Sequence, residues 1–172
     1  MDAAAEGSSE VANTLMLLPH NLQLIVQPTG AKTCERKIHA RCLINTSTVF
    51  GPLIAPRRPI TLRPASPPAS VLPLLTAADL SLIESFDVSS NATCNWMKFV
   101  RFAMRDGLAN MEAVQRRGQL FFHVTRDIPR GDELIVALSP SFIASHRGVG
   151  EVCRKYVVAR HARIRRVNEW FD

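Results

Sequence analysis

The amino-acid sequence predicts an α+β domain that is mostly β, made of short strands with a few short helices. Short apolar runs bounded by Gly and Pro recur through the middle of the chain, which is typical of small sheets. Hydrophobic residues make up 47% of the 172 residues, enough for one folded domain. We expect a flexible arm over residues 1–14, the domain over residues 15–145 and a basic helical tail over residues 146–172.

Three apolar segments in the first third of the domain predict strands. Residues 22–26 and 38–44 have the length and composition of strands. The apolar stretch 49–55 is interrupted by Gly51-Pro52, which favours an edge strand or a bend over a central strand.

Residues 56–75 predict a surface loop or an extended connector, because no regular helix tolerates their density of proline. This stretch holds six of the eleven prolines: Pro56, Pro59, Pro64, Pro67, Pro68 and Pro73. Thr76 can cap a helix, and Asp79 favours the positive end of its dipole. We therefore expect a helix from Thr76 to about Phe86.

The second half of the domain predicts a short helix and a hairpin. Apolar residues at helical spacing favour an amphipathic helix over residues 95–104. Residues 111–115 and 119–125 are expected to pair as strands around Arg116-Arg117-Gly118, with Gly118 at a position of positive φ.

Three further elements complete the expected order. Residues 127–131 predict a turn that leads into a strand over residues 133–138. Residues 149–170 predict a last helix whose apolar side could dock on the domain while its basic side faces outward.

Five motifs, taken in order, resemble a known family. Residues 49–53 read VFGPL, residues 95–101 read NWMKFVR and residues 119–122 read QLFF. Residues 105–113 (RDGLANMEA) are a weaker match, and residues 126–136 (RDIPRGDELIV) are the closest. This ordered set resembles the PR/SET domain of the PRDM family of transcriptional regulators.

The resemblance implies a SET-like fold of small curved sheets. Its fold-motif positions here are Trp96, Phe99, Phe122, Gly131, Glu133 and Leu134. The aromatic residues would serve as core in this fold and equally in another α+β domain, so they do not indicate activity.

The residues that would make such a domain a methyltransferase are largely absent. The family implies Trp, Tyr and Gly at the end of the last strand, where this chain has Ala137, Leu138 and Ser139. Arg101-Phe102 stands about where the family's Asn-His cofactor contact falls, although PR domains commonly lack that His.

Two more departures point the same way. The family implies a Gly-x-Gly bend near its N-terminus, but Gly30 is the single Gly between Val26 and Cys42. Tyr156, the one tyrosine, lies beyond the matched region. We therefore expect no catalytic residue and no cofactor. The alternative is an S-adenosylmethionine (SAM)-dependent protein-lysine methyltransferase acting on histones.

The cysteines and histidines do not predict a metal site. The cysteines are most simply buried thiols, since Cys34 and Cys42 with His39 match no zinc-finger spacing. His123, on a strand among aromatics, is expected to be a half-buried, hydrogen-bonded residue and not a catalytic base. The four cysteines are Cys34, Cys42, Cys94 and Cys153.

The whole chain has a formal net charge of +6, and its positive charge gathers toward the C-terminal end. A basic patch is formed by Arg160, Arg163, Arg165 and Arg166. The patch could make weak, non-specific contacts with nucleic acid, serve as a nuclear import signal, or be a solvated helix face.

Taken together, these features favour a divergent PR/SET domain that acts as a protein-interaction module in the nucleus, with chromatin-associated partners. An unrelated basic α+β protein that binds nucleic acid through its tail is a further reading. No signal peptide or membrane span is expected, because the apolar run Leu15–Leu18 is too short. Zinc-finger spacing is absent, which fits a short isoform, a fragment or a stand-alone relative.

Overall fold

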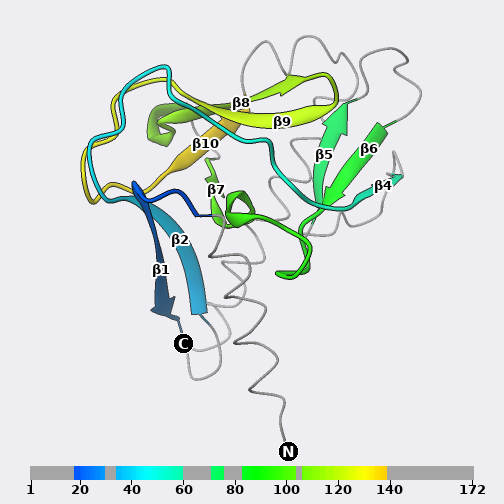
Figure 1. Cartoon of the computed structure of the whole chain (residues 1–172), viewed down its shortest axis with the longest axis horizontal. Coiled ribbons are helices and arrows are strands. Elements are labelled where there is room, and N and C mark those ends of the chain that lie inside the picture. Colours follow the sequence, from blue (N-terminus) through cyan, green and yellow to red (C-terminus); the bar gives the residue numbers. More distant parts are fainter. Residues whose placement is uncertain (1–17, 30–33, 60–70, 76–82, 104–105, 139–172) are drawn as a thin grey trace, which may run out of the picture.

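Ten strands and two short 3-10 helices build the part of the chain that the computed structural model describes, which is residues 18–29, 34–59, 71–75, 83–103 and 106–138 (Figure 1). The elements are β1 (Leu22–Pro28), β2 (Cys34–Ala40), β3 (Val49–Phe50), β4 (Arg57–Pro59), β5 (Val71–Leu75), β6 (Ile83–Asp87), η1 (Trp96–Phe99), β7 (Arg101–Phe102), η2 (Asp106–Leu108), β8 (Met111–Arg116), β9 (Gln119–Val124) and β10 (Ile135–Leu138). The predicted α+β class with mostly short strands is confirmed.

The strands form three sheets. β1 and β2 make an antiparallel ribbon, and β4, β6 and β5 make an antiparallel sheet with β6 in the centre. The remaining strands form a mixed sheet in the order β3-β9-β8-β10-β7. Figure 1 shows the β1–β2 ribbon and the β4–β6–β5 sheet on opposite sides of this five-stranded sheet.

The β8–β9 hairpin forms as the local sequence predicts. Residues of each strand alternate between buried and partly exposed, so one face of the hairpin lies on the core. The two-residue turn has both central residues at positive φ, with Arg117 at 49° and Gly118 at 71°. That combination suits the right-handed twist of a tight hairpin.

β10 is placed by partners that are far away in the sequence. It runs parallel to β8 on one side and to β7 on the other. Val136 lies opposite both Met111 and Phe102, and all three are buried. β10 therefore passes through the middle of the domain, and its last residues emerge at the edge of the core.

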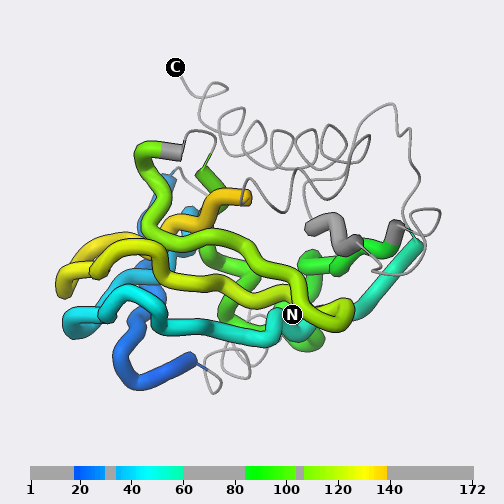
Figure 2. Tube along the Cα trace, turned by 90° about the horizontal axis from the view of Figure 1, so that it is seen from above, coloured from blue at the N-terminus to red at the C-terminus, as the bar shows by residue number. Residues whose placement is uncertain are grey.

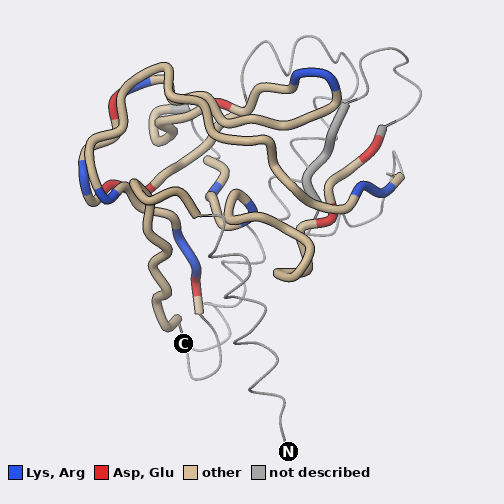
Figure 3. Tube along the Cα trace, in the orientation of Figure 1, with Lys and Arg blue, Asp and Glu red and all other residues tan. Residues whose placement is uncertain are grey.

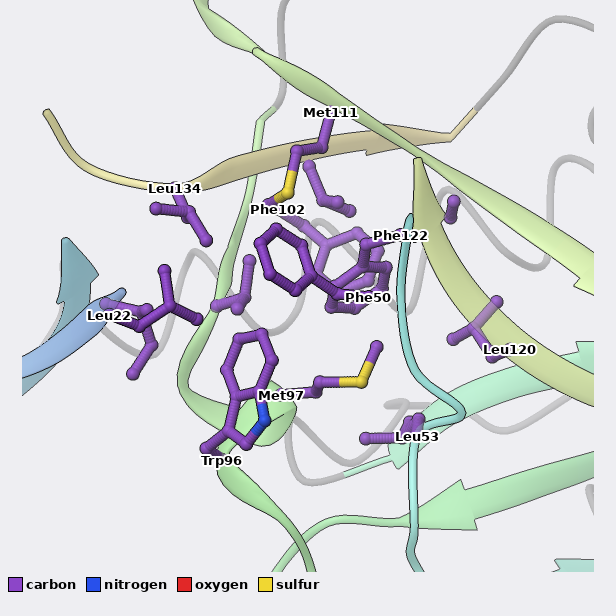
Figure 4. Close-up of a cluster of buried hydrophobic side chains, with 14 of the residues drawn as sticks. Leu22, Phe50, Leu53, Trp96, Met97, Phe102, Met111, Leu120, Phe122 and Leu134 are labelled. Atoms are coloured by element: carbon purple, nitrogen blue, oxygen red, sulfur yellow. The ribbon is translucent and has the colours of Figure 1, made fainter. Parts of the chain in front are cut away.

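The core is apolar and lies between the five-stranded sheet, the β1–β2 ribbon and η1 (Figure 4). Phe102 and Phe122 meet edge to face with ring centroids 5.9 Å apart, and Phe50 meets Trp96 in the same way at 5.5 Å. The largest fully buried side chains are Phe122, Leu22, Ile38, Met97, Met111, Ile128, Leu134, Val100, Val124 and Val136.

The expected helix from Thr76 to about Phe86 is wrong where the structure describes it. Ile83–Asp87 is β6, the central strand of its sheet, bonded to β4 and β5 on its two edges. Phe86 and Ser85 are each 2% exposed. The segment is a strand because pairing on both of its edges overrides the local helical signals. Residues 76–82 lie outside the described part.

The expected proline-rich loop over residues 56–75 is also wrong in part, because it contributes β4 and β5. Both are edge strands, and each contains one proline, Pro59 in β4 and Pro73 in β5. An edge strand tolerates proline because the N–H that proline lacks is not needed for pairing on its outer side. Residues 60–70 are not described.

Residues 95–104 form less helix than predicted. η1 is a single turn, and the chain is extended at Val100, with φ −67° and ψ 130°. It continues into β7, because Arg101 and Phe102 pair with β10. The apolar residues at helical spacing thus serve two elements, a turn and a strand.

Two boundaries in the first half also differ from expectation. The second strand covers Cys34–Ala40 and not residues 38–44, and Ile44 makes an isolated bridge to Ile128. The apolar stretch after residue 48 gives the edge strand β3, as its Gly51-Pro52 interruption predicted.

The described residues contain no helix long and apolar enough to cross a membrane. The predicted tail helix over residues 149–170, the arm over residues 1–14 and the basic patch lie outside the described part.

Candidate functional site

The site singled out by the sequence is the C-terminal end of β10. Ala137 lies opposite Glu112 and Leu138 opposite Ala113 on β8. Both residues are partly buried, and Leu138 packs against the hydrophobic core. Their side chains carry no hydrogen-bond donor or acceptor, so this end of the strand offers only backbone polar groups. Ser139 lies outside the described part.

Beside this end runs β7, with Arg101 and Phe102. The Arg101 guanidinium binds Glu133 as a fork, since its Nε donates to Oε1 at 2.9 Å and its Nη2 to Oε2 at 3.0 Å. The two side chains are 32% and 15% exposed. Such bidentate pairs hold both partners in one geometry. Phe102 is buried against Phe122.

Asn110, which the sequence reasoning did not select, ties the same segment to β8. It is 6% exposed, its Nδ2 donates to the Glu133 carbonyl at 2.8 Å, and its Oδ1 accepts from the Ile135 N–H at 2.9 Å. Its own backbone N–H donates to the Ile135 carbonyl at 3.0 Å. The sequence offers only a polar amide just before β8, which does not indicate the backbone groups that it binds.

The turn before β10 is fixed from the other side by the end of β2. Gly131 has φ 93°, a conformation that favours glycine, and its carbonyl lies 2.8 Å from Nδ1 of His39. Leu134 donates its N–H to the Ile38 carbonyl at 2.8 Å, and Ala40 donates to Asp132 at 2.9 Å. Gly131, Glu133 and Leu134 therefore sit where three segments meet.

The aromatic fold-motif residues lie in or beside the core. Trp96 and Phe122 are buried, at 5% and 0% exposed. Phe99 is half-buried, with the Arg36 guanidinium 5.9 Å and the Lys98 ammonium 5.4 Å from its ring centroid. None of the three offers a reactive group.

The described cysteines do not match the expectation of buried thiols at every position. Cys34 and Cys42 are exposed, while Cys94 is buried. Burial raises the pKa of the Cys94 thiol, which donates to the Asp87 carbonyl at 3.4 Å. A buried thiol with a raised pKa is a poor nucleophile. Among the described residues, no group of three metal-ligating side chains is close enough to hold a metal ion.

Two carboxylates have pKa values below the usual 3.8 because of local hydrogen bonds. The side-chain and backbone bonds from Ser89 lower the pKa of Asp87, and the backbone N–H and hydroxyl of Thr46 lower that of Asp127. His123 is half-buried, with Nδ1 3.5 Å from Oε1 of Glu112 on the neighbouring strand. These contacts are structural.

Comparison with known sequences identifies the domain. The chain matches the family described as PR domain zinc finger protein 2, PR domain, over residues 24–148. The chain belongs to the PR domain family.

Its PR domain matches PR domain zinc finger protein 15 of Mus musculus with 43% identity over 51 residues, which is 30% of this chain and 4% of that protein. It matches the Bos taurus protein named "Putative histone-lysine N-methyltransferase PRDM6" with 34% identity over 64 residues, 37% of this chain and 11% of that protein. The matched stretch is thus a small fraction of each relative.

Solved structures share the fold. The methyltransferase domain of human PR domain-containing protein 2 superposes with a TM-score of 0.61 at 16% identity, covering 74% of this chain and 83% of that one. The SET protein ATXR5, in complex with histone H3.1, superposes with a TM-score of 0.54 at 17% identity, covering 80% and 66%. The PR domain described here is therefore related to histone methyltransferase domains in architecture.

Proposed function

We propose that this PR domain is a protein-interaction module in nuclear transcriptional regulation, without efficient methyltransferase activity. One observation carries the proposal: the last residues of β10 are Ala137 and Leu138, whose side chains are apolar, and Leu138 packs against the core. The family supports the proposed nuclear setting, because the relatives include PR domain zinc finger proteins.

Lysine methylation needs groups that this end of β10 lacks. The amine must lose a proton and align behind the sulfonium methyl of SAM, a task of positioning and electrostatics. Ala137 and Leu138 can neither orient nor polarise an amine. The Arg101 guanidinium, where the family's Asn-His contact would fall, is already bound by Glu133. The described residues therefore do not fit a SAM site of the family type, and we propose no cofactor.

An edge strand supplies a surface for partners. β3 lies at the edge of the five-stranded sheet, where its Val49 is 53% exposed, and Ile54 nearby is 52% exposed. A free edge flanked by exposed apolar side chains can bind an extended peptide as an added strand. Nuclear or chromatin-associated proteins are the partners that we propose.

The alternative is a SAM-dependent protein-lysine methyltransferase acting on histones. The names of related proteins and the shared fold favour it. Tyr156 would then have to supply the hydroxyl from the segment after residue 138.

The full chain should be incubated with tritiated SAM and core histones. We expect no label above that seen with heat-denatured protein, because the end of β10 lacks orienting groups. Label that depends on the folded chain would support the methyltransferase instead.

The interaction role needs its own measurement. Proteins crosslinked to the full chain in nuclear extract should be lost with Val49→Lys, which places a charge on the β3 edge, and retained with Gln27→Lys, an exposed control on β1. Equal recovery with both variants would contradict the proposed edge surface.

A further inference from the structure

Arginines gather at one end of the five-stranded sheet. We call this surface the arginine end, formed by Arg57 and Arg58 of β4 and by Arg116 and Arg117 of the β8–β9 hairpin. Figure 3 shows them as two basic segments on the same side of the molecule, and Figure 2 shows the hairpin turn beside the β4 segment. The loop of residues 125–132 lies at the opposite end of the sheet.

The two halves of the arginine end are joined by a side chain. Arg57 donates through Nη2 to the Gly118 carbonyl at 2.7 Å, and its guanidinium carbon lies 5.8 Å from the Phe86 ring centroid. The hairpin turn is thereby held against β4. The two backbone segments that carry the four arginines therefore keep a defined spacing.

The charge of this end is only partly neutralised. Glu84 lies 3.5 Å from Arg57, and Asp87 lies 2.8 Å from Arg58. Arg116 and Arg117 are exposed, and neither side chain makes a hydrogen bond or an ion pair with the described residues. Within the described part of the chain, the hairpin tip therefore carries two cations that no carboxylate pairs.

Arg117 is also an unfavourable residue for its own backbone. Its φ of 49° lies in the left-handed region, where Asn and Gly are preferred at this position of a two-residue hairpin turn. No contact of its side chain within the described part of the domain offsets that strain. A strained residue without a structural reason is a reasonable sign of a role in binding.

From these observations we infer that the arginine end binds the phosphodiester backbone of nucleic acid without sequence preference. Guanidinium forks match phosphate oxygens, and all four basic residues here are arginine. A two-stranded ribbon is narrow enough to enter the major groove of a DNA duplex. This site goes beyond the proposed interaction role, and it is separate from the basic residues of the C-terminal tail.

The test is the binding of the full chain to a labelled DNA duplex of about two helical turns, followed by fluorescence anisotropy at several salt concentrations. Two to three phosphate contacts predict a plot of log K against log salt with a slope of about −2 to −3. Arg116→Gln with Arg117→Asn should weaken binding about tenfold at low salt and flatten the slope by about two. The thermal midpoint should not fall, because Asn suits the left-handed turn position.

A matched control removes the same charge from the opposite end of the sheet. Arg126→Gln with Arg130→Gln alters two exposed arginines and should leave DNA affinity within about twofold. A variant with Arg160, Arg163, Arg165 and Arg166 changed to Gln shows what the tail contributes. It should retain a salt-dependent component that the hairpin substitutions then abolish.

Each of the following results would overturn the inference. The first is an absence of DNA binding, and wild-type affinity in the hairpin variant would count equally. The second is equal weakening by the hairpin and control variants, which would indicate net charge alone. The third is binding to poly-glutamate at least as tight as binding to DNA, which would indicate an acidic protein partner.

Discussion

The two ends of the segment Gly131–Leu138 differ sharply. Its beginning is held by polar contacts from three directions: His39 from β2, Arg101 from β7 and Asn110 from the start of β8. Its end, Ala137 and Leu138, offers apolar side chains to its surroundings. The contacts that fix this segment and the apolar side chains at its far end therefore belong to different residues.

This contrast separates the contacts that fix the fold from the residues at the end of β10. The partly buried backbone groups of Glu133 and Ile135 need partners, and Asn110 supplies them. Leu138 packs against the core and takes no part in these bonds, so the fold is compatible with the proposed lack of methyl transfer.

The largest effect is expected from removing the Asn110 side chain, which holds the Gly131 end of the segment. Asn110→Ala removes two side-chain hydrogen bonds and leaves a carbonyl and an N–H of the Glu133–Ile135 backbone unsatisfied. The free energy of unfolding should fall by about 2–4 kcal/mol. Urea unfolding measures it, with the exposed Gln119→Ala as a control that should change it by less than about 0.5 kcal/mol. A loss below that of the control would refute the role given to Asn110.

A smaller effect is expected from the fork between Arg101 and Glu133. Arg101→Ala leaves a carboxylate that is only 15% exposed without its partner, and should lower the free energy of unfolding by about 1–2 kcal/mol. A double-mutant cycle with Glu133→Gln should give a coupling energy of about 1 kcal/mol. Additive effects of the two substitutions would mean that the pair contributes no stability of its own.

At the apolar end, Leu138→Ala should behave as a substitution at the edge of the core. Leu138 is partly buried, so the expected loss is about 1 kcal/mol, below the range for fully buried leucines. Like the wild-type chain, the same variant should transfer no methyl group to core histones above the heat-denatured control. Transfer by the wild-type chain that Leu138→Ala lowers would instead place Leu138 in a working site.

The smallest effect concerns Asp127, in the turn before the held end. The N–H and hydroxyl of Thr46 donate to Asp127 and lower its pKa below 3.8. The contribution of Asp127 to stability is therefore present above the unfolded-state pKa. It is lost as the pH falls through the folded-state pKa. Asp127→Asn should therefore lower the thermal midpoint near neutral pH and have little effect near pH 3, about one pH unit below the ordinary pKa of an aspartate. The same difference at both pH values would assign the effect to another cause.

The sequence predicts best the elements whose signals are local. Alternating residues and an Arg-Gly turn predict the β8–β9 hairpin, and the Gly51-Pro52 interruption predicts an edge strand. The sequence predicts helix at β6 and β7, which are strands because each pairs with distant segments. Helical spacing in the same residues could not reveal those partners.

The candidate site shows the same division. The absence of the family's reactive residues at Ala137 and Leu138 can be read directly from the sequence. The role of Asn110 cannot, since its two side-chain bonds reach backbone groups 23 and 25 residues away. The bond between Arg101 and Glu133 likewise depends on the parallel pairing of β7 and β10.

The most direct test of the central claim is a calorimetric titration of the full, folded chain with SAM. Because Ala137, Leu138 and the bound Arg101 do not provide a family-type cofactor site, we predict no saturable heat from micromolar to millimolar cofactor. A saturable signal with one site per chain would contradict this account and support the methyltransferase.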